Sequence, residues 1–210
     1  DAFGKGGGLA LFFKGTASGN NVILSNCKFQ NNRAIWGGGL HAEFHDAAMG
    51  NVIEINRSNF SYNSATVGGG GLRVAYYTPG YNRNKTANKV LLRSSTFVGN
   101  NAFMGGATAL LPSLLRADDP MPEILVSNCT FDSNEAELGS AVYGSYIKLS
   151  SVSLVPVIAF QMCNFINNFL ELQMDRRITE PYIGIGAVYL NGIHAKFYGI
   201  ILFANNSGSA

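Results

Sequence analysis

The pattern Phe-x-x-Asn recurs six times along this 210-residue chain, and it restricts the fold more than any other feature of the sequence. Subtracting the positions of successive Phe residues gives intervals of 31 to 38 residues. Repeats with a period of roughly 20 to 50 residues are typical of solenoids, propellers and arrays. We therefore expect one structural unit repeated along the chain. The six copies are Phe29 and Asn32, Phe60 and Asn63, Phe97 and Asn100, Phe131 and Asn134, Phe165 and Asn168, and Phe203 and Asn206.

A block of small residues follows most copies of this pattern. The blocks read GGGL at 37–40, GGGGL at 68–72, GGAT at 105–108 and GSAV at 139–142, with GGGL at 6–9 and a delayed GIGAV at 184–188. Glycine suits a corner where φ is positive or where side chains would crowd. A phosphate-binding loop would need a following Lys-Ser or Lys-Thr, which these blocks lack. We interpret the glycines as corners of the repeated unit.

Apolar residues alternate with others before each Phe. They occupy the positions seven and five residues upstream, as Val22 and Leu24 do in the first copy and Ile53 and Ile55 in the second. A period of two indicates a strand with one buried face. Phe itself has the opposite parity, so the polar pair between the two sets, such as Ser25-Asn26, predicts a bend. Each unit thus reads as strand, bend, short strand, Asn turn and a further strand.

Several short strands per unit, without an amphipathic helix, are typical of a parallel β-helix. A β-sandwich is the alternative, but sandwiches have shorter strand spacings and do not repeat their sequence. We predict an all-β, right-handed, single-stranded parallel β-helix of about five to six coils over residues 1–210. In such a stack, Phe lies over Phe in an aromatic ladder, and Asn bonds to Asn through turn amides.

The pairing of F-x-x-N with G-G-(A/G/S)-(I/L/V) resembles the repeat of the chlamydial polymorphic outer-membrane proteins and of related right-handed β-helix surface proteins. The resemblance covers nearly the whole chain. It implies an extracellular or cell-surface location and an adhesive or scaffolding role. On this basis we expect a non-enzymatic structural or adhesive solenoid that stacks into a longer body or fibre. Its partners would be further coils or other copies of the same solenoid.

The charge balance excludes some other functions. Fifteen Lys and Arg residues against thirteen Asp and Glu give a net charge of +2, without the basic patch that nucleic-acid binding requires. No run of 18 apolar residues occurs, so we expect no membrane span in this segment. The opening DAFGKGGG is not a signal peptide, and we expect a processed product or an excerpt of a longer solenoid.

Three long connections fall at the same place in the repeat. They read HDAAMGN, YYTPGYNRNKTANK and LPSLLRADDPMPE, so we expect them to project from one edge of the solenoid. The second contains Tyr76, Tyr77 and Tyr81, a residue type favoured at binding surfaces. This loop edge is a candidate contact for a protein or glycan ligand. An ordinary variable loop packed by its own aromatic residues is the alternative.

Sequons of the form N-x-S/T predict surface glycosylation if the protein is secreted by a eukaryotic cell. In a bacterial protein the same residues would simply favour turns. The candidate positions are Asn56, Asn59, Asn84, Asn128 and Asn205.

The cysteines share one position in the repeat, two residues before Phe. Cys27, Cys129 and Cys163 occupy it in three copies, and Ser58 and Ser95 in two others. This pattern favours inward-facing cysteines that act as small apolar residues. A disulfide between Cys129 and Cys163 in adjacent coils remains an alternative.

A carbohydrate-active enzyme, either a polysaccharide lyase or a glycoside hydrolase, or a carbohydrate-binding module is the alternative function for this fold. Glycoside hydrolysis needs two neighbouring carboxylates. Asp118 and Asp119 lie in a loop expected to be solvated, while Glu135 and Glu137 flank the presumed outside of a turn. None of these acids pairs with a second acid and a base on one face, so we predict no catalytic residue.

The segment HAEFH at 41–45 is the best candidate cluster of functional side chains. Alternation places His41, Glu43 and His45 on one outward face, and such residues can bind zinc. Successive side chains on one face of a strand stand about 7 Å apart, however, which is too far for all three to meet one ion without distortion. We expect a solvated polar face, with no metal and no cofactor.

Overall fold

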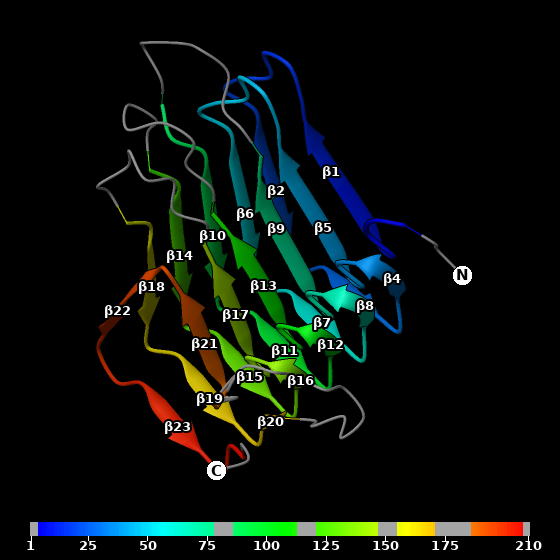
Figure 1. The fold of residues 1–210 in the computed structure, drawn as a ribbon, viewed down its shortest axis with the longest axis vertical. Helices are drawn as coiled ribbons and strands as arrows, with labels where there is room; N and C mark the ends of the chain where they lie inside the picture. The colour runs from blue at the N-terminus through cyan, green and yellow to red at the C-terminus, as the bar shows by residue number, and fades with distance from the viewer. Residues whose placement is uncertain (1–3, 78–85, 113–120, 147–154, 171–185, 208–210) are drawn as a thin grey trace, which may run out of the picture.

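A computed structural model describes residues 4–77, 86–112, 121–146, 155–170 and 186–207. Their strands form four parallel sheets, and successive coils each add one strand to each sheet (Figure 1). The chain is therefore an all-β solenoid of about five stacked turns, which confirms the predicted fold class. The described residues include no helix, and so none that is long and apolar enough to cross a membrane.

Sheets I and II carry the longer strands. Sheet I consists of β1 (Leu9–Phe13), β5 (Leu40–Phe44), β9 (Leu72–Tyr76), β13 (Thr108–Leu111), β17 (Val142–Ser145) and β21 (Val188–Asn191). Sheet II consists of β2 (Asn21–Ser25), β6 (Val52–Asn56), β10 (Lys89–Arg93), β14 (Glu123–Ser127), β18 (Val157–Gln161) and β22 (His194–Tyr198).

Sheets III and IV are built from shorter strands that follow sheet II in each coil. Sheet III consists of β3 (Lys28–Gln30), β7 (Asn59–Ser61), β11 (Thr96–Val98), β15 (Thr130–Asp132), β19 (Asn164–Ile166) and β23 (Leu202–Ala204). Sheet IV consists of β4 (Arg33–Trp36), β8 (Ser64–Gly68), β12 (Asn101–Met104), β16 (Glu135–Leu138) and β20 (Phe169–Leu170).

Single residues in the left-handed region make the bends between these sheets. The second residue of each polar pair, between sheets II and III, has a φ of 48° to 56°, as in Asn26 and Arg57. A second such residue stands two positions after Phe, as Tyr62 does with a φ of 55°. Asn tolerates this conformation better than most residues, which explains its frequency at these bends. The bend expected at the polar pair is confirmed.

Glycine makes the corner between sheets IV and I. Gly69 has a φ of 69°, and the neighbouring Gly70 packs directly against the next coil. A Cβ atom on Gly70 would collide with the backbone oxygens of Gly106 and Asn101. The glycine blocks thus let two coils approach at this corner.

The Phe of each Phe-x-x-Asn pattern stacks on the Phe of the next coil. Successive ring centroids lie 4.6 to 5.0 Å apart, with interplanar angles of 5° to 10°. The rings of Phe60, Phe97, Phe131 and Phe165 are fully buried. This column, together with the inward apolar residues of sheets I and II, forms one continuous core along the solenoid.

The Asn residues form a second column, in which each interior side chain bonds to both neighbouring coils. The backbone N and Nδ2 of Asn100 both donate to Oδ1 of Asn134 at 3.0 Å. Nδ2 of Asn100 also donates to the carbonyl oxygen of Phe60 at 2.9 Å. Bonds of this kind connect the column from Asn32 to Asn206.

Two further ladders were not predicted. Asn20, Asn51 and Asn88 form a shorter column of the same kind just before sheet II, with Nδ2-to-Oδ1 distances of 2.8 and 3.0 Å. Rings also stack in sheet I, where Phe44 lies 4.8 Å from the ring of Phe13 on one side and from Tyr76 on the other. The signal for the first was present in the sequence, since each Asn stands two residues before an apolar strand position.

The cysteines are free thiols in the structure. Cys129 and Cys163 are fully buried, and Cys27 is partly exposed. Each of the two buried thiols donates a hydrogen bond to a carbonyl oxygen of its own coil, as Cys129 does to Ser127 at 3.3 Å. Burial raises the pKa of Cys129 to about 12. The inward, apolar role fits both residues, and a disulfide between Cys129 and Cys163 stays a prediction.

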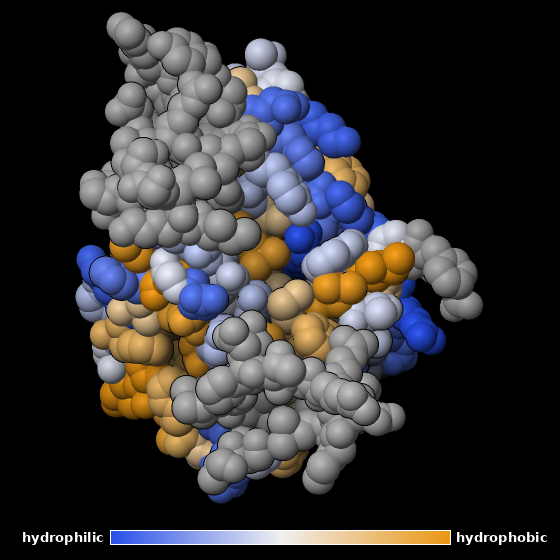
Figure 2. Space-filling view, viewed as in Figure 1, coloured by the Kyte–Doolittle hydropathy of each residue, from blue (hydrophilic) through white to orange (hydrophobic). Residues whose placement is uncertain are grey.

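The last coil exposes the ladder residues that inner coils bury. Phe203 and Phe197 are 51% and 47% exposed, whereas Phe131 is fully buried. Figure 2 shows hydrophobic side chains gathered at the lower left, over β22 and β23. Within the described residues, no strand pairs with the outer edges of β22 and β23.

Candidate functional site

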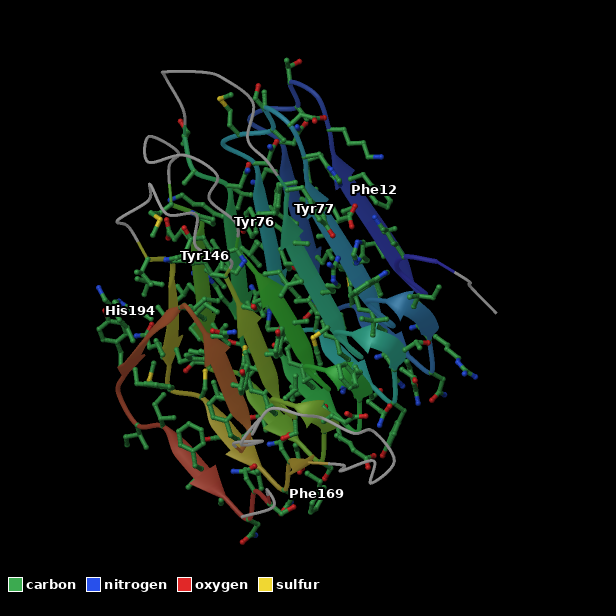
Figure 3. All side chains as sticks on the ribbon, viewed as in Figure 1. Phe12, Tyr76, Tyr77, Tyr146, Phe169 and His194 are labelled. Carbon is green, nitrogen blue, oxygen red and sulfur yellow. The ribbon has the colours of Figure 1, made fainter. Side chains whose placement is uncertain are left out.

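The outward face of sheet I carries the polar cluster that includes the HAEFH segment. In-register stacking places Ala10, His41 and Arg73 side by side on β1, β5 and β9. Two residues further along the strands, Glu43 lies next to Phe12. Figure 3 shows Phe12 on β1 and Tyr77 at the end of β9, on either side of β5. Parallel stacking thus brings together side chains about one repeat apart in the sequence.

Glu43 is the centre of this cluster, and its carboxylate contacts four basic side chains. Nζ of Lys5 lies 2.7 Å from Oε1 and 2.9 Å from Oε2. Nε2 of His41 lies 2.8 Å from Oε1, and Nε2 of His45 lies 2.7 Å from Oε2. Nη1 of Arg73 is more distant, at 3.5 Å from Oε1.

The expectation of a solvated polar face at this segment is wrong. His41 and Glu43 are fully buried, and Arg73 is only 4% exposed. Lys5 from the segment before β1 and Arg73 from β9 pair with the carboxylate, so its burial does not leave an unpaired charge. The two imidazoles lean toward the carboxylate between them and contact it directly.

Burial and hydrogen bonding fix the charges of the cluster. Burial lowers the pKa of His41 to about 4, so this imidazole is neutral at neutral pH. Burial alone would raise the pKa of Glu43, but hydrogen bonds from Lys5, His45 and His41 outweigh it and lower that pKa to about 2. Glu43 is therefore ionised at neutral pH, and Lys5 and Arg73 are paired with it.

Arg73 connects this cluster to an adjacent pocket. Its guanidinium carbon lies 4.3 Å from the ring centroid of Trp36, a cation–π contact. Its Nη2 donates to the hydroxyl of Tyr77 at 3.0 Å. Within the described residues, its buried Nε has no hydrogen-bond partner. Arg73 is thus held by aromatic side chains while part of its donor capacity remains unused.

The pocket is a cavity of about 340 Å³ on the outward side of sheet I. A volume of this size lies at the lower end of the range for small-molecule sites. Ala75 is the small residue in register between Glu43 and Leu111 on the neighbouring coils. The described lining residues include Trp36, Arg73, Tyr77, Met104, Leu111 and Tyr143.

Sequence reasoning missed most of this lining. Trp36, Gly68 and Met104 are in register at the ends of β4, β8 and β12, each one residue before a left-handed glycine. The Trp36 ring lies over Gly68, where a Cβ atom would be in ordinary contact with the ring at 3.7 Å. Aligning the repeats on their glycines would have revealed this position, whereas Arg73 and Tyr143 carry no comparable signal.

The predicted loop edge is only partly described. The strands on either side show that the long connections all join sheet I to sheet II, which places their ends at one edge of the solenoid. Tyr76 is buried in the core, where burial raises its pKa, and Tyr77 is exposed. Both residues border the pocket. Tyr81 lies outside the described residues, as do Asp118 and Asp119.

The remaining candidates lie apart from the pocket. Glu135 accepts a hydrogen bond from Asn101 at 3.3 Å and, like Glu137, belongs to β16 in sheet IV. Among the sequons, Asn128 and Asn205 are exposed at left-handed bends, whereas Asn56 and Asn59 are only partly exposed. Asn84 lies outside the described residues.

Comparison with protein-family models, with curated proteins and with solved structures returned no match. The described residues also contain no group of three or more His, Cys, Asp and Glu side chains placed to hold a metal ion. The interpretation of the site therefore rests on its own geometry: an ion cluster beside an aromatic pocket, joined through Arg73.

Proposed function

We propose that this protein is a non-enzymatic adhesive solenoid that binds a glycan in the pocket on sheet I. The observation that supports this most is the pocket lining, where Trp36, Tyr77 and Tyr143 surround Arg73. Flat aromatic rings pack against the C–H faces of sugar rings, and neighbouring polar groups bond to the hydroxyls. The parallel sheet holds these residues on rigid strands, so binding requires little ordering of the protein.

Binding fits the cluster better than catalysis does. A general acid must carry a proton at neutral pH, whereas Glu43 has a pKa of about 2. Its two oxygens already contact Lys5, His41 and His45. Glycoside hydrolysis also needs a second carboxylate within about 10 Å, and Glu43 is the one acid described among the contacts of this cluster. A carbohydrate-active enzyme on the same fold is the alternative.

Binding of the labelled protein to an array of immobilised glycans tests the proposal. The protein should bind at least one glycan class, and Trp36→Ala should abolish the signal. Tyr198→Ala is the matched control, because Tyr198 is a half-exposed aromatic residue on sheet II, away from the pocket. Absence of glycan binding by the folded protein would contradict the proposal. Turnover of pectin, alginate or a glycosaminoglycan that Glu43→Gln abolishes would establish the enzymatic alternative.

An extracellular or cell-surface location is part of this proposal. It is supported by the likeness of the repeat to that of the chlamydial polymorphic outer-membrane proteins, and the exposed sequons Asn128 and Asn205 are consistent with it. Secretion from eukaryotic cells followed by mass spectrometry of tryptic peptides would measure glycan occupancy. In a eukaryotic source, we expect these two exposed sequons to be modified before the partly exposed Asn59. Unmodified peptides at both positions would contradict the glycoprotein form of the proposal.

Stacking through the end coil completes the proposal. Phe197, Ile200 and Phe203 form an apolar surface, exposed among the described residues, beside an edge of β23 with which no described strand pairs. A coil with Phe at the same position would extend the aromatic ladder and pair this edge. Light scattering over a concentration series should show assemblies that Phe203→Lys disrupts. A monodisperse monomer at all concentrations would argue against stacking of copies.

A further inference from the structure

We infer that the pocket on sheet I selects an acidic sugar, in which a ring carboxylate binds Arg73 while the sugar ring packs between Trp36 and Tyr143. This inference rests on the proposed glycan binding and adds the chemical class of the ligand. It follows from the charge on the pocket wall, from the Nε donor of Arg73, which has no described partner, and from the placement of the aromatic rings.

The charges around the pocket favour an anion. The described cluster contains one Lys and one Arg side chain, Lys5 and Arg73, against one carboxylate, Glu43. Lys5 lies within 3 Å of both carboxylate oxygens and is the closer partner. Arg73 reaches the same carboxylate only at 3.5 Å. Among the described residues, Lys5 is therefore the closer partner of the carboxylate, and Arg73, which lines the pocket, keeps only the longer ion pair with it.

The geometry of Arg73 adds to this preference. A guanidinium has five N–H donors and binds a carboxylate best through two parallel hydrogen bonds. Nη2 of Arg73 donates to the Tyr77 hydroxyl at 3.0 Å, and Nη1 makes a longer contact of 3.4 Å with Nε2 of His41. Its Nε is buried without a described partner. Its 4% exposure keeps water away from the charge, which strengthens its attraction for an anion that enters the pocket.

The walls of the pocket favour a sugar ring over a bare inorganic anion. Trp36 stands on one side of Arg73 at 4.3 Å, while Tyr143 from β17 supplies a ring two coils further along sheet I. Leu111 and Met104 make the intervening surface apolar. A small inorganic anion would make no contact with these apolar and aromatic walls. A uronate ring presents apolar C–H faces to the aromatic side chains and carries a carboxylate at its edge.

Isothermal titration calorimetry with three probes tests the inference. The probes are an α-1,4-linked galacturonate trisaccharide, the same trisaccharide with its carboxyl groups reduced to alcohols, and benzoate. We expect the acidic trisaccharide to bind at least tenfold more tightly than the reduced form, the difference of about one charged hydrogen bond. Arg73→Lys should lose about tenfold in affinity for the acidic form, because an ammonium cannot bind a carboxylate through two parallel bonds.

Two further variants keep the test independent of folding defects. Tyr143→Ala changes a half-buried wall residue and should weaken both trisaccharides, whereas Arg93→Gln, on sheet II, should weaken neither. Circular dichroism of each variant should give the spectrum of the unchanged, folded protein.

Equal affinity for the acidic and reduced trisaccharides would overturn the inference and leave the proposed glycan binding intact. Tighter binding of benzoate than of the acidic trisaccharide would show an aromatic carboxylate site and would likewise overturn it. Failure of both trisaccharides to bind, combined with a silent glycan array, would overturn the proposed function as well.

Discussion

Replacing Asn100 with alanine should remove a large part of the stability of the solenoid. The fully buried side chain makes four hydrogen bonds: Oδ1 accepts from the backbone N and Nδ2 of Asn63, and Nδ2 donates to the Phe60 carbonyl and to Asn134. A buried hydrogen bond contributes about 1 kcal/mol net, and a buried donor left unpaired costs about 1 to 3 kcal/mol. The alanine variant should lower the free energy of unfolding by about 4 to 6 kcal/mol.

Asn32→Ala is the matched control, because it is the same substitution at the end of the same ladder. The side chain of Asn32 is partly exposed and donates one described hydrogen bond, to Oδ1 of Asn63 at 2.9 Å. We expect a loss of about 1 kcal/mol. Urea unfolding followed by circular dichroism measures both variants against the unchanged protein. Equal losses would refute the argument that bonding to both neighbouring coils makes the interior Asn residues more important.

Three shorter predictions follow from the same structure. Phe97→Ala should lower the free energy of unfolding by about 3 to 5 kcal/mol, because the Phe97 ring is fully buried. Phe203 is half-exposed, so Phe203→Ala should lower it by about 1 kcal/mol or less. Equal losses of stability in urea unfolding would contradict the ladder argument. Gly70→Ala should prevent native folding, because its Cβ meets backbone of the next coil, whereas Gly4→Ala, with open space around it, should leave the circular dichroism spectrum unchanged. Glu43 has a lowered folded pKa of about 2 against an ordinary 4.5, so it stabilises the fold fully above about pH 4.5, and about 3 kcal/mol is lost as the pH falls to about 2. Acid unfolding of Glu43→Gln should lack this loss, and an unchanged acid profile would show that the carboxylate is not held as described.

The fold could be predicted because every coil imposes the same physical requirements. Phe97 must fill the space between two other rings, and Asn100 must satisfy the turn amides of its neighbours. The same residue types therefore recur at the same positions of each repeat. This recurrence can be recognised in a single sequence. The second Asn column through Asn51 obeyed the same rule and was missed because the comparison was centred on Phe.

The candidate site was harder to predict because its contacts cross between coils. His41, Glu43 and His45 were recognised as one outward face, but their burial depends on Lys5 and Arg73. These partners are 38 and 30 residues from Glu43, and nothing in the local pattern shows their proximity. Strand alternation predicts which way a side chain points, whereas the register between coils decides what it meets.

The pocket itself arises where the repeat omits side chains. Gly68 stands between Trp36 and Met104 in sheet IV, and Ala75 stands between Glu43 and Leu111 in sheet I. A small residue between two large ones leaves a hollow about one coil wide, because the coils are fixed about 4.8 Å apart. Residues on inward columns must stay similar to keep the coils stacked, so specificity can develop only on outward columns. Ligand sites in such solenoids should therefore be sought where an outward column of stacked residues has a small side chain between two large ones.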